Sequence, residues 1–227
     1  MKMSTEKHDI EQIDQMSSVG DRLPASRRRP PSRIATSGPA GIFSFASTTF
    51  ILSMFNVNAR SVHTPNVVVG MALFTGGLLQ FMAGMWAFPK GDVFGATAFS
   101  SYGCFWMSYA TILIPASGIQ AAYSDQQEFN NAVGIYLITW MMVTILFVLP
   151  VLRRNMSFVI LLSILALAFA LLAAGSFTGM VNITKAGGIV GIIVAFIAYY
   201  IGVSEMLSAE ARPVMRLPLG VMYVNDI

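Results

Sequence analysis

Long apolar intervals without charged residues alternate with short polar connections over most of the chain. These intervals run over residues 34–59, 64–89, 93–124, 129–152, 155–184 and 186–204. A helix needs about 20 apolar residues to cross a hydrocarbon core of about 30 Å, and each interval can supply one. The pattern therefore predicts six transmembrane helices, near residues 40–58, 67–88, 94–115, 131–151, 156–177 and 186–204.

The composition supports a protein that lies mostly within a bilayer. Hydrophobic residues make up 55% of the 227 residues and charged residues only 11%. A soluble domain usually carries about 25% charged residues. We therefore expect an all-α membrane protein with short loops and with no large domain outside the membrane.

Positive charges are distributed unevenly between the two sides of this expected bundle. If the N-terminus is cytoplasmic, that side holds Arg27, Arg28, Arg29, Arg33, Lys90, Arg153, Arg154, Arg212 and Arg216. The opposite side holds Arg60 and Lys185. Loops rich in Lys and Arg stay on the cytoplasmic side of a membrane, so both termini are expected to be cytoplasmic.

Polar segments flank the expected transmembrane domain, which we place at residues 34–205. Residues 1–33 are expected to form a disordered cytoplasmic tail, because the segment is polar and of mixed charge. Its Arg-rich end favours a topology signal, with attraction to anionic lipid or a phosphorylation site as alternatives. Residues 206–227 are expected to form a short cytoplasmic tail, irregular because of Pro213 and Pro218.

Polar side chains recur at helical spacing within two of the predicted helices. Residues 94–115 read FGATAFSSYGCFWMSYATILIP, and steps of three and four residues along a helix stay on one face. One such stripe comprises Thr97, Ser101, Cys104, Ser108 and Thr111. The stripe beside it comprises Tyr102, Trp106 and Tyr109. The first predicted helix carries a similar row of Phe45, Thr49, Ser53 and Asn56.

Two interpretations of these rows remain open. Small and weakly polar residues let transmembrane helices pack closely, which is the role that we favour for Gly76, Gly84, Gly187 and Gly191. Alternatively, the hydroxyl rows and Gln80 line a narrow polar path for a small solute, with Phe45 and Tyr102 as bulky gates. We favour packing between helices or an interfacial position for Trp106, Tyr109 and Trp140.

The predicted helices lack the residues that intramembrane enzymes and ion pumps use. No charged residue or histidine lies within them, and Glu205 follows the sixth. His8 and His63 lie outside the helices and have no partners for a zinc site. Cys104 is the single cysteine, which excludes a disulfide within one chain. We therefore expect no enzyme, no metal and no other cofactor.

Several segments resemble the acetate uptake transporter family, whose bacterial members include the succinate–acetate permease and whose fungal members include acetate permeases and proposed ammonia exporters. The most specific motif is FGATAFSSYGCFWMSYATILIPASGI in the third predicted helix. The resemblance covers about residues 36–205 and includes SFASTTFILSMFNVNA, GMALFTGGLLQFMAGMWAFPKGDVFGATAF and FTGMVNITKAGGIVGIIVAFIAYY. It implies six-helix protomers that assemble into hexamers, each protomer with its own path.

The resemblance also implies which residues line that path. By their places in the matching motifs, Phe45, Tyr102 and Leu165 form a hydrophobic constriction. The threonine pair of the family falls on Thr48 and Thr49, next to Phe45. A small residue near the path in the sixth helix falls on Ala198.

One motif departs from the family pattern. The family opens its first helix with Asn-Pro-Ala-Pro-Leu-Gly-Leu, whereas residues 36–42 read TSGPAGI. Pro39 and Gly41 are kept, but the Asn, the first Pro and a Leu are not. The missing Asn removes a potential cap or solute contact at a helix start, where an anion is favoured. The expected consequence is one of three alternatives: altered selectivity, weak transport or a regulatory role.

These observations favour a plasma-membrane transporter or channel for acetate and similar short monocarboxylates, coupled to protons. Thr48, Thr49 and Ser101 would donate hydrogen bonds to the carboxylate, while the constriction closes around the methyl group. The expected partners are acetate with a proton, the lipid bilayer and further copies of the chain, with no nucleic acid. Export of ammonium or ammonia is the alternative, and a non-transporting membrane sensor or regulator is another.

Overall fold

The computed structural model describes residues 34–153 and 155–221, and these residues form helices joined by short loops. Within this part of the chain the only strand-like pairing is one isolated bridge between Asn155 and Val221. The residues from Thr36 onward form one compact unit. The expected tail of residues 1–33 lies outside the described residues.

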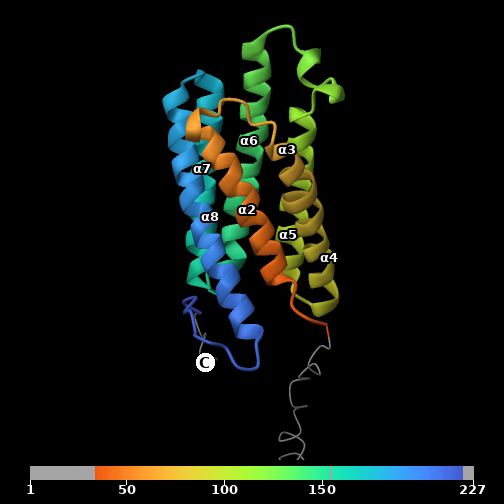
Figure 1. Ribbon diagram of the computed structural model, residues 1–227, viewed down its shortest axis with the longest axis vertical. Coiled ribbons are helices and arrows are strands. Elements are labelled where there is room, and N and C mark those ends of the chain that lie inside the picture. Colours follow the sequence, from red (N-terminus) through yellow and green to blue (C-terminus); the bar gives the residue numbers. More distant parts are fainter. Residues whose placement is uncertain (1–33, 154, 222–227) are drawn as a thin grey trace, which may run out of the picture. The chain divides into compact units, whose positions relative to one another are not determined.

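The long helices lie side by side and run along a common axis (Figure 1). They are α2 (Gly38–Asn56), α5 (Val93–Leu113), α6 (Gln126–Val148), α7 (Met156–Thr178) and α8 (Val181–Ala209). A further continuous rod comprises α3 (Val68–Gly70), the π-helical segment η2 (Met71–Leu79) and α4 (Gln80–Lys90). Single 3-10 turns are η1 (Ala59–Ser61), η3 (Pro115–Ser117), η4 (Gln120–Ala122) and η5 (Leu149–Val151).

Local sequence explains where several of these helices begin and end. The side chains of Asp92, Asp125 and Asn155 accept hydrogen bonds from the first backbone N–H groups of α5, α6 and α7. Such caps satisfy donors that have no partner within the helix. Gly91 and Gly179 follow α4 and α7 with φ of 77° and 66°, a conformation that glycine adopts without strain.

Each of the six predicted segments contains helix in the structure, with small changes of boundary. Five helical segments are long and apolar enough to cross a membrane, namely Gly38–Asn56, Val68–Lys90, Gln126–Val151, Met156–Thr178 and Val181–Ala209. The predicted third segment forms the 21-residue helix α5, which is not among these five. The last helix, α8, continues to Ala209, beyond the predicted end at residue 204.

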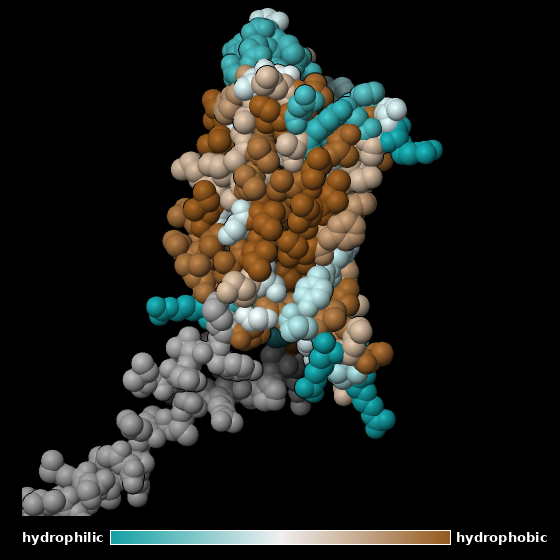
Figure 2. Space-filling model, turned by 90° about the vertical axis from the view of Figure 1, so that its left-hand side faces the viewer, coloured by the Kyte–Doolittle hydropathy of each residue, from teal (hydrophilic) through white to brown (hydrophobic). Residues whose placement is uncertain are grey.

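An apolar belt between two polar ends covers the face of the bundle shown in Figure 2. Large hydrophobic side chains stay exposed along it, for example Phe74, Ile135, Leu146 and Phe196, each with more than 60% of its surface open. Soluble monomers rarely expose apolar surface on this scale. The helices and this belt together identify a multi-pass membrane protein.

Glycines bring neighbouring helices into close contact, which confirms the predicted packing role. A Cβ atom added at Gly84 of α4 would lie 2.5 Å from the backbone nitrogen of Ser100 in α5. Additions at Gly76, Gly187 and Gly191 would likewise overlap Thr48, Leu172 and Ser53, respectively. The bundle is therefore tightly packed along α2 against η2 and α8, along α4 against α5, and along α7 against α8.

Aromatic side chains fill the space between α5 and α6. Phe105 of α5 lies with its ring centroid 5.1 Å from that of Trp140 and 5.8 Å from that of Tyr136. Tyr102 packs edge-on against Phe147 at 5.8 Å, and its hydroxyl lies 2.9 Å from that of Thr144. Large rings, rather than small residues, therefore hold this pair of helices together.

Residues 217–221 fold back onto the bundle as a C-terminal strap. The backbone N–H groups of Met156 and Ser157, at the start of α7, donate to the carbonyl oxygens of Gly220 and Leu219 at 3.0 and 3.2 Å. Ser204 and Tyr200 of α8 donate to the carbonyls of Leu217 and Pro218 at 2.6 and 2.7 Å. The C-terminal strap thus links the end of α8 to the beginning of α7.

Candidate functional site

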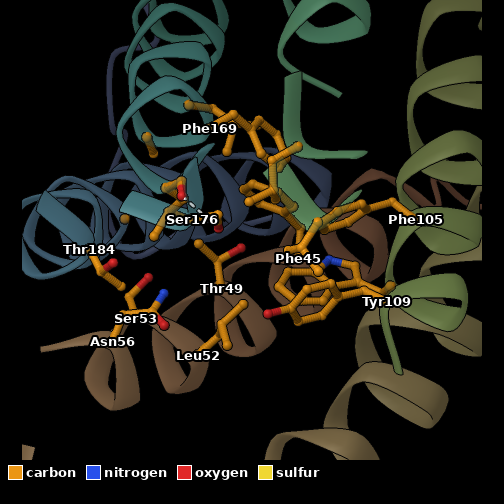
Figure 3. A pocket seen from close by; sticks show the side chains of 17 residues that line it. Phe45, Thr49, Leu52, Ser53, Asn56, Phe105, Tyr109, Phe169, Ser176 and Thr184 are labelled. Atoms are coloured by element: carbon orange, nitrogen blue, oxygen red, sulfur yellow. Dashed lines mark hydrogen bonds between the residues drawn. The ribbon is translucent and has the colours of Figure 1, made fainter. Parts of the chain in front are cut away.

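A cavity of about 130 Å³ lies between α2, α5, α6, α7 and α8 (Figure 3). A water molecule takes about 30 Å³ in the liquid, so the cavity has room for a few waters or for a solute the size of acetate. It is lined by Phe45, Thr49, Leu52, Ser53, Asn56, Phe105, Trp106, Tyr109, Val133, Leu137, Leu165, Ala168, Phe169, Leu172, Ser176, Thr184 and Gly191. These described residues include no Lys, Arg, His, Asp or Glu, so the lining is uncharged.

One end of the cavity is polar. It is formed by Ser53 and Asn56 near the end of α2, Ser176 near the end of α7, and Thr184 near the start of α8. Ser53, Asn56 and Thr184 lie together in Figure 3, with Thr49 further along the same face of α2. We call these four residues, Ser53, Asn56, Ser176 and Thr184, the polar mouth.

The opposite end is aromatic and apolar. Phe45, Phe105, Trp106, Tyr109 and Phe169 surround it, and Leu165 contributes from α7. These rings pack against one another, with Phe105 at 5.0 Å from Trp106 and at 5.4 Å from Phe169. We call this set of five rings the aromatic end. A solute moving inward from the polar mouth would therefore exchange polar partners for apolar ones.

Two buried polar atoms at the cavity have no hydrogen-bond partner. They are the hydroxyl oxygen of Thr49 and the indole Nε1 of Trp106. Thr49 is only 7% exposed and Trp106 only 3%. An unpaired buried polar group costs about 1–3 kcal/mol, so such groups are rare and call for an explanation.

Two residues of the predicted constriction line the cavity, and the third packs against one of them. Phe45 and Leu165 line the cavity from α2 and α7. The ring of Tyr102 lies 5.8 Å from that of Phe45, centroid to centroid, and is 4% exposed. Tyr102 itself is not part of the lining. It therefore packs against Phe45 from outside the lining.

Of the other predicted contact residues, Thr49 lines the cavity and three lie elsewhere. The hydroxyl of Thr48 is fully buried against η2 and donates to the carbonyl of Ser44 at 3.0 Å. Ala198 is fully buried in α8, and Ser101 is half-buried on α5. The structure does not bring these three residues to the cavity.

The two stripes of α5 face in different directions. Thr97, Cys104, Ser108 and Thr111 of the hydroxyl stripe are exposed on the outside of the protomer. Trp106 and Tyr109 of the aromatic stripe line the cavity instead. The hydroxyl stripe therefore does not line this cavity, whereas the first-helix row of Phe45, Thr49, Ser53 and Asn56 does so along its whole length.

The altered family signature, residues 36–42, lies at the start of α2. The helix begins at Gly38 with Pro39 in its first turn, as the sequence predicts. The hydroxyl of Thr36 accepts a weak hydrogen bond from the N–H of Gly38 at 3.4 Å. The carboxylate of Glu205, from α8, occupies the space that a side chain at Gly38 would need. An internal carboxylate thus lies at this helix start.

Known proteins with similar sequences include membrane transport proteins. The chain is 40% identical over 203 residues to ammonia transport outward protein 2 of Saccharomyces cerevisiae, covering 89% of this chain and 72% of the yeast protein. It is 31% identical over 190 residues to the succinate-acetate/proton symporter SatP of Escherichia coli, covering 83% of this chain and 97% of that protein.

A solved structure and a family description complete the comparison. The structure of the bacterial acetate channel SatP matches with a TM-score of 0.73 at 29% identity, covering 82% of this chain and 99% of the channel. Residues 19–220 match the family described as GPR1/FUN34/yaaH. Because this match spans most of the sequence, the chain belongs to the GPR1/FUN34/yaaH family.

Proposed function

We propose that the protein is a membrane transporter or channel, not an enzyme, for acetate and similar short monocarboxylates. The observation that carries this proposal is the uncharged cavity that leads from the polar mouth to the aromatic end. A short monocarboxylate has the same two parts, a polar carboxyl group and a small apolar group. Similarity to proteins named as an acetate channel and a succinate-acetate/proton symporter supports it.

In this proposal the solute enters at the polar mouth, where hydroxyl and amide groups replace part of its water shell. Its methyl group then meets Phe45 and Leu165, which close the cavity. Passage requires the side chains of Phe45, Tyr102 and Leu165 to move apart, and their bulk limits the size of the solute. Thr48, Ser101 and Ala198 stay predicted contacts for the part of the path beyond Phe45.

We propose coupled movement of a proton, because the lining offers no charge to balance a carboxylate. Burying an unpaired ion in an apolar site is costly, and the neutral acid avoids that cost. None of the described lining residues carries an ionisable acid or base that titrates near neutral pH. The proton would therefore travel on the solute itself.

We also propose that α5 is a sixth spanning helix. Its 21 residues give a length of about 30 Å, which matches the hydrocarbon core. Lys90, Arg153, Arg212 and Arg216 then share one side, which would be cytoplasmic and would hold both termini. Residues 34–205 would form the membrane domain of a plasma-membrane protein, between tails of residues 1–33 and 206–227.

A hexamer of such protomers is the proposed assembly. The outward hydroxyl stripe of α5 would be poorly matched to lipid but well suited to contact with a neighbouring protomer, because small residues and hydroxyls favour helix association. The path would stay within each protomer, since the cavity is enclosed by helices of one chain.

Export of ammonium or ammonia is the second candidate function. The rings of the aromatic end could hold a cation over their faces, and the relative in yeast is named for outward ammonia transport. A sensor or regulator without transport is the third candidate, suggested by the altered start of α2.

Uptake of labelled acetate into liposomes that contain the purified protein tests the main proposal, with and without an inward proton gradient. We expect the proton gradient to stimulate acetate uptake. We also expect the Tyr102→Ala variant to differ from the wild type in solute selectivity. Labelled methylammonium, measured in parallel, tests the second candidate. A folded protein that carries methylammonium but not acetate would reverse the order of the two candidates, and one that carries neither would favour the sensor.

A further inference from the structure

Two hydrogen-bond donors at the cavity are held without acceptors. The indole N–H of Trp106 and the hydroxyl of Thr49 are buried and have no partner, and both residues line the same cavity. Trp106 comes from α5 and Thr49 from α2, so two separately packed helices each bring one donor. Tight packing against Phe105 at 5.0 Å fixes the position of the indole.

The two donors differ in what they can bind. An indole N–H only donates, whereas a hydroxyl can donate or accept. An ionised carboxylate only accepts, and a neutral carboxylic acid still has a carbonyl oxygen that accepts. Ammonium has only donors, so it gains nothing from Trp106. The donor-only group thus makes this end of the cavity suited to solutes that accept hydrogen bonds.

The rest of the cavity offers no site that would favour ammonium over solutes that accept hydrogen bonds. Its described lining residues carry no negative charge that would attract a cation. The rings that might hold ammonium by their faces are engaged with one another, Phe105 with Trp106 at 5.0 Å and Trp106 with Tyr109 at 6.5 Å. Loss of the surrounding water also makes an unpaired donor costly, and an acceptor from the solute would remove that cost.

We propose that Trp106 and Thr49 form a two-donor carboxyl site in the cavity, and that the indole N–H of Trp106 determines selectivity for carboxyl solutes over ammonium. This inference rests on the proposed transport of monocarboxylates and adds the residues that recognise the carboxyl group. The apolar remainder of the solute would then lie toward Phe45 and Leu165.

Conservative variants test the proposal in liposomes. Trp106→Phe removes the N–H but keeps an aromatic ring, and we expect the half-saturation concentration of acetate to rise about tenfold. Thr49→Val should act in the same direction, whereas Thr49→Ser, which keeps the hydroxyl, should restore most of the affinity. Methylammonium flux should not fall in Trp106→Phe. Trp86→Phe is the matched control, because Trp86 is 57% exposed on α4, away from the cavity.

A spectroscopic measurement covers the case in which Trp106→Phe does not fold. The chain has 3 tryptophans, so the indole ¹H–¹⁵N signal of Trp106 is the one that remains after Trp86 and Trp140 have been assigned by substitution. Acetate should shift this signal in a saturable manner, and methylammonium should not.

The outcomes separate this proposal from the proposed function. Wild-type protein that carries no acetate overturns both. If the wild type carries acetate while Trp106→Phe keeps the same half-saturation concentration, or while the Trp106 signal is unmoved by saturating acetate, only the two-donor site is overturned.

Discussion

Leu165 lines the cavity from α7, and Phe45 lines it from α2. It is 5% exposed, and its side chain is the one aliphatic group of the predicted constriction. A shorter side chain at this position would enlarge the cavity. The size of the acids that the protein accepts should therefore depend on this single residue.

Leu165→Ala is expected to admit larger acids such as lactate and succinate. Space for one extra methylene changes the discrimination between two solutes by about 10–200-fold. Lactate and succinate should therefore inhibit acetate uptake at least about tenfold more strongly than in the wild type. The free energy of unfolding should fall by about 2–5 kcal/mol, the usual cost of this substitution in a core. Uptake competition and thermal unfolding measure the two effects.

Leu161→Ala is the matched control for this variant. Leu161 lies one helical turn earlier on α7 and is 2% exposed, but it does not line the cavity. It should lose similar stability and keep the original selectivity. Equal selectivity in the two variants contradicts a size-limiting role for Leu165.

The hydroxyl of Tyr102 should matter less than its ring. In Tyr102→Phe the hydroxyl of Thr144 keeps its bond to the carbonyl of Trp140 at 2.7 Å, so no buried donor is left unpaired. We expect a loss of about 0.5–1.5 kcal/mol in unfolding free energy and unchanged solute selectivity. Tyr102→Ala, which also removes the ring, should relax selectivity. Uptake assays on the two variants in parallel distinguish these effects. Relaxed solute selectivity in Tyr102→Phe would contradict gating by the ring.

At the scale of helices, hydrophobic pattern predicted much of the fold because spanning a bilayer requires long apolar segments. Each of the six predicted segments is helical, and the expected close contacts at Gly76 and Gly84 are present. The pattern did not predict which face of α5 turns inward. Both of its stripes have helical spacing, and only packing against the distant α6, which needs large rings to fill the gap, selects the aromatic one.

Only some of the residues that line the cavity could be predicted, because local spacing does not show how distant helices pack. The row on α2 could be read from its spacing, since Phe45, Thr49, Ser53 and Asn56 follow steps of three and four residues and all line the cavity. Trp106 was expected to serve packing, although it shares a stripe with Tyr102, and only its unpaired N–H distinguishes it. Ser176 and Thr184 lie near helix ends in different segments, and no local pattern shows that they meet.

Gly84→Ala is expected to weaken the contact between α4 and α5. The added Cβ would lie 2.5 Å from a backbone nitrogen, which cannot move as a side chain would. Overpacking of this kind costs about 1–3 kcal/mol. At Gly70, in the same rod, a Cβ would have nothing within 4 Å, so Gly70→Ala should keep or raise stability. Thermal unfolding in detergent compares the variants, and equal midpoints contradict the close contact.

At the scale of the whole molecule, the outward stripe of α5 gives a test of assembly. Cys104 is the single cysteine and is exposed in the protomer. If this face contacts a neighbouring protomer, a membrane-permeant maleimide should label Cys104 slowly in the native assembly and quickly after dissociation by harsh detergent. Mass spectrometry measures the extent of labelling. Equally fast labelling in both states contradicts an interface on this stripe.

The C-terminal strap also imposes an order on how the protein is made. The hydroxyl of Ser157 donates to the carbonyl of Leu219, 62 residues later, so this contact at the start of α7 forms only after α8 and the C-terminal strap have been made. The first helices can insert one by one, but closure of this side of the bundle must wait for the last segment. A stop codon after Arg216 should therefore yield protein that inserts yet is cleared by quality control, whereas a stop after Val221 should not. Pulse-chase half-lives of the two products would show whether the end of the chain acts as this final checkpoint.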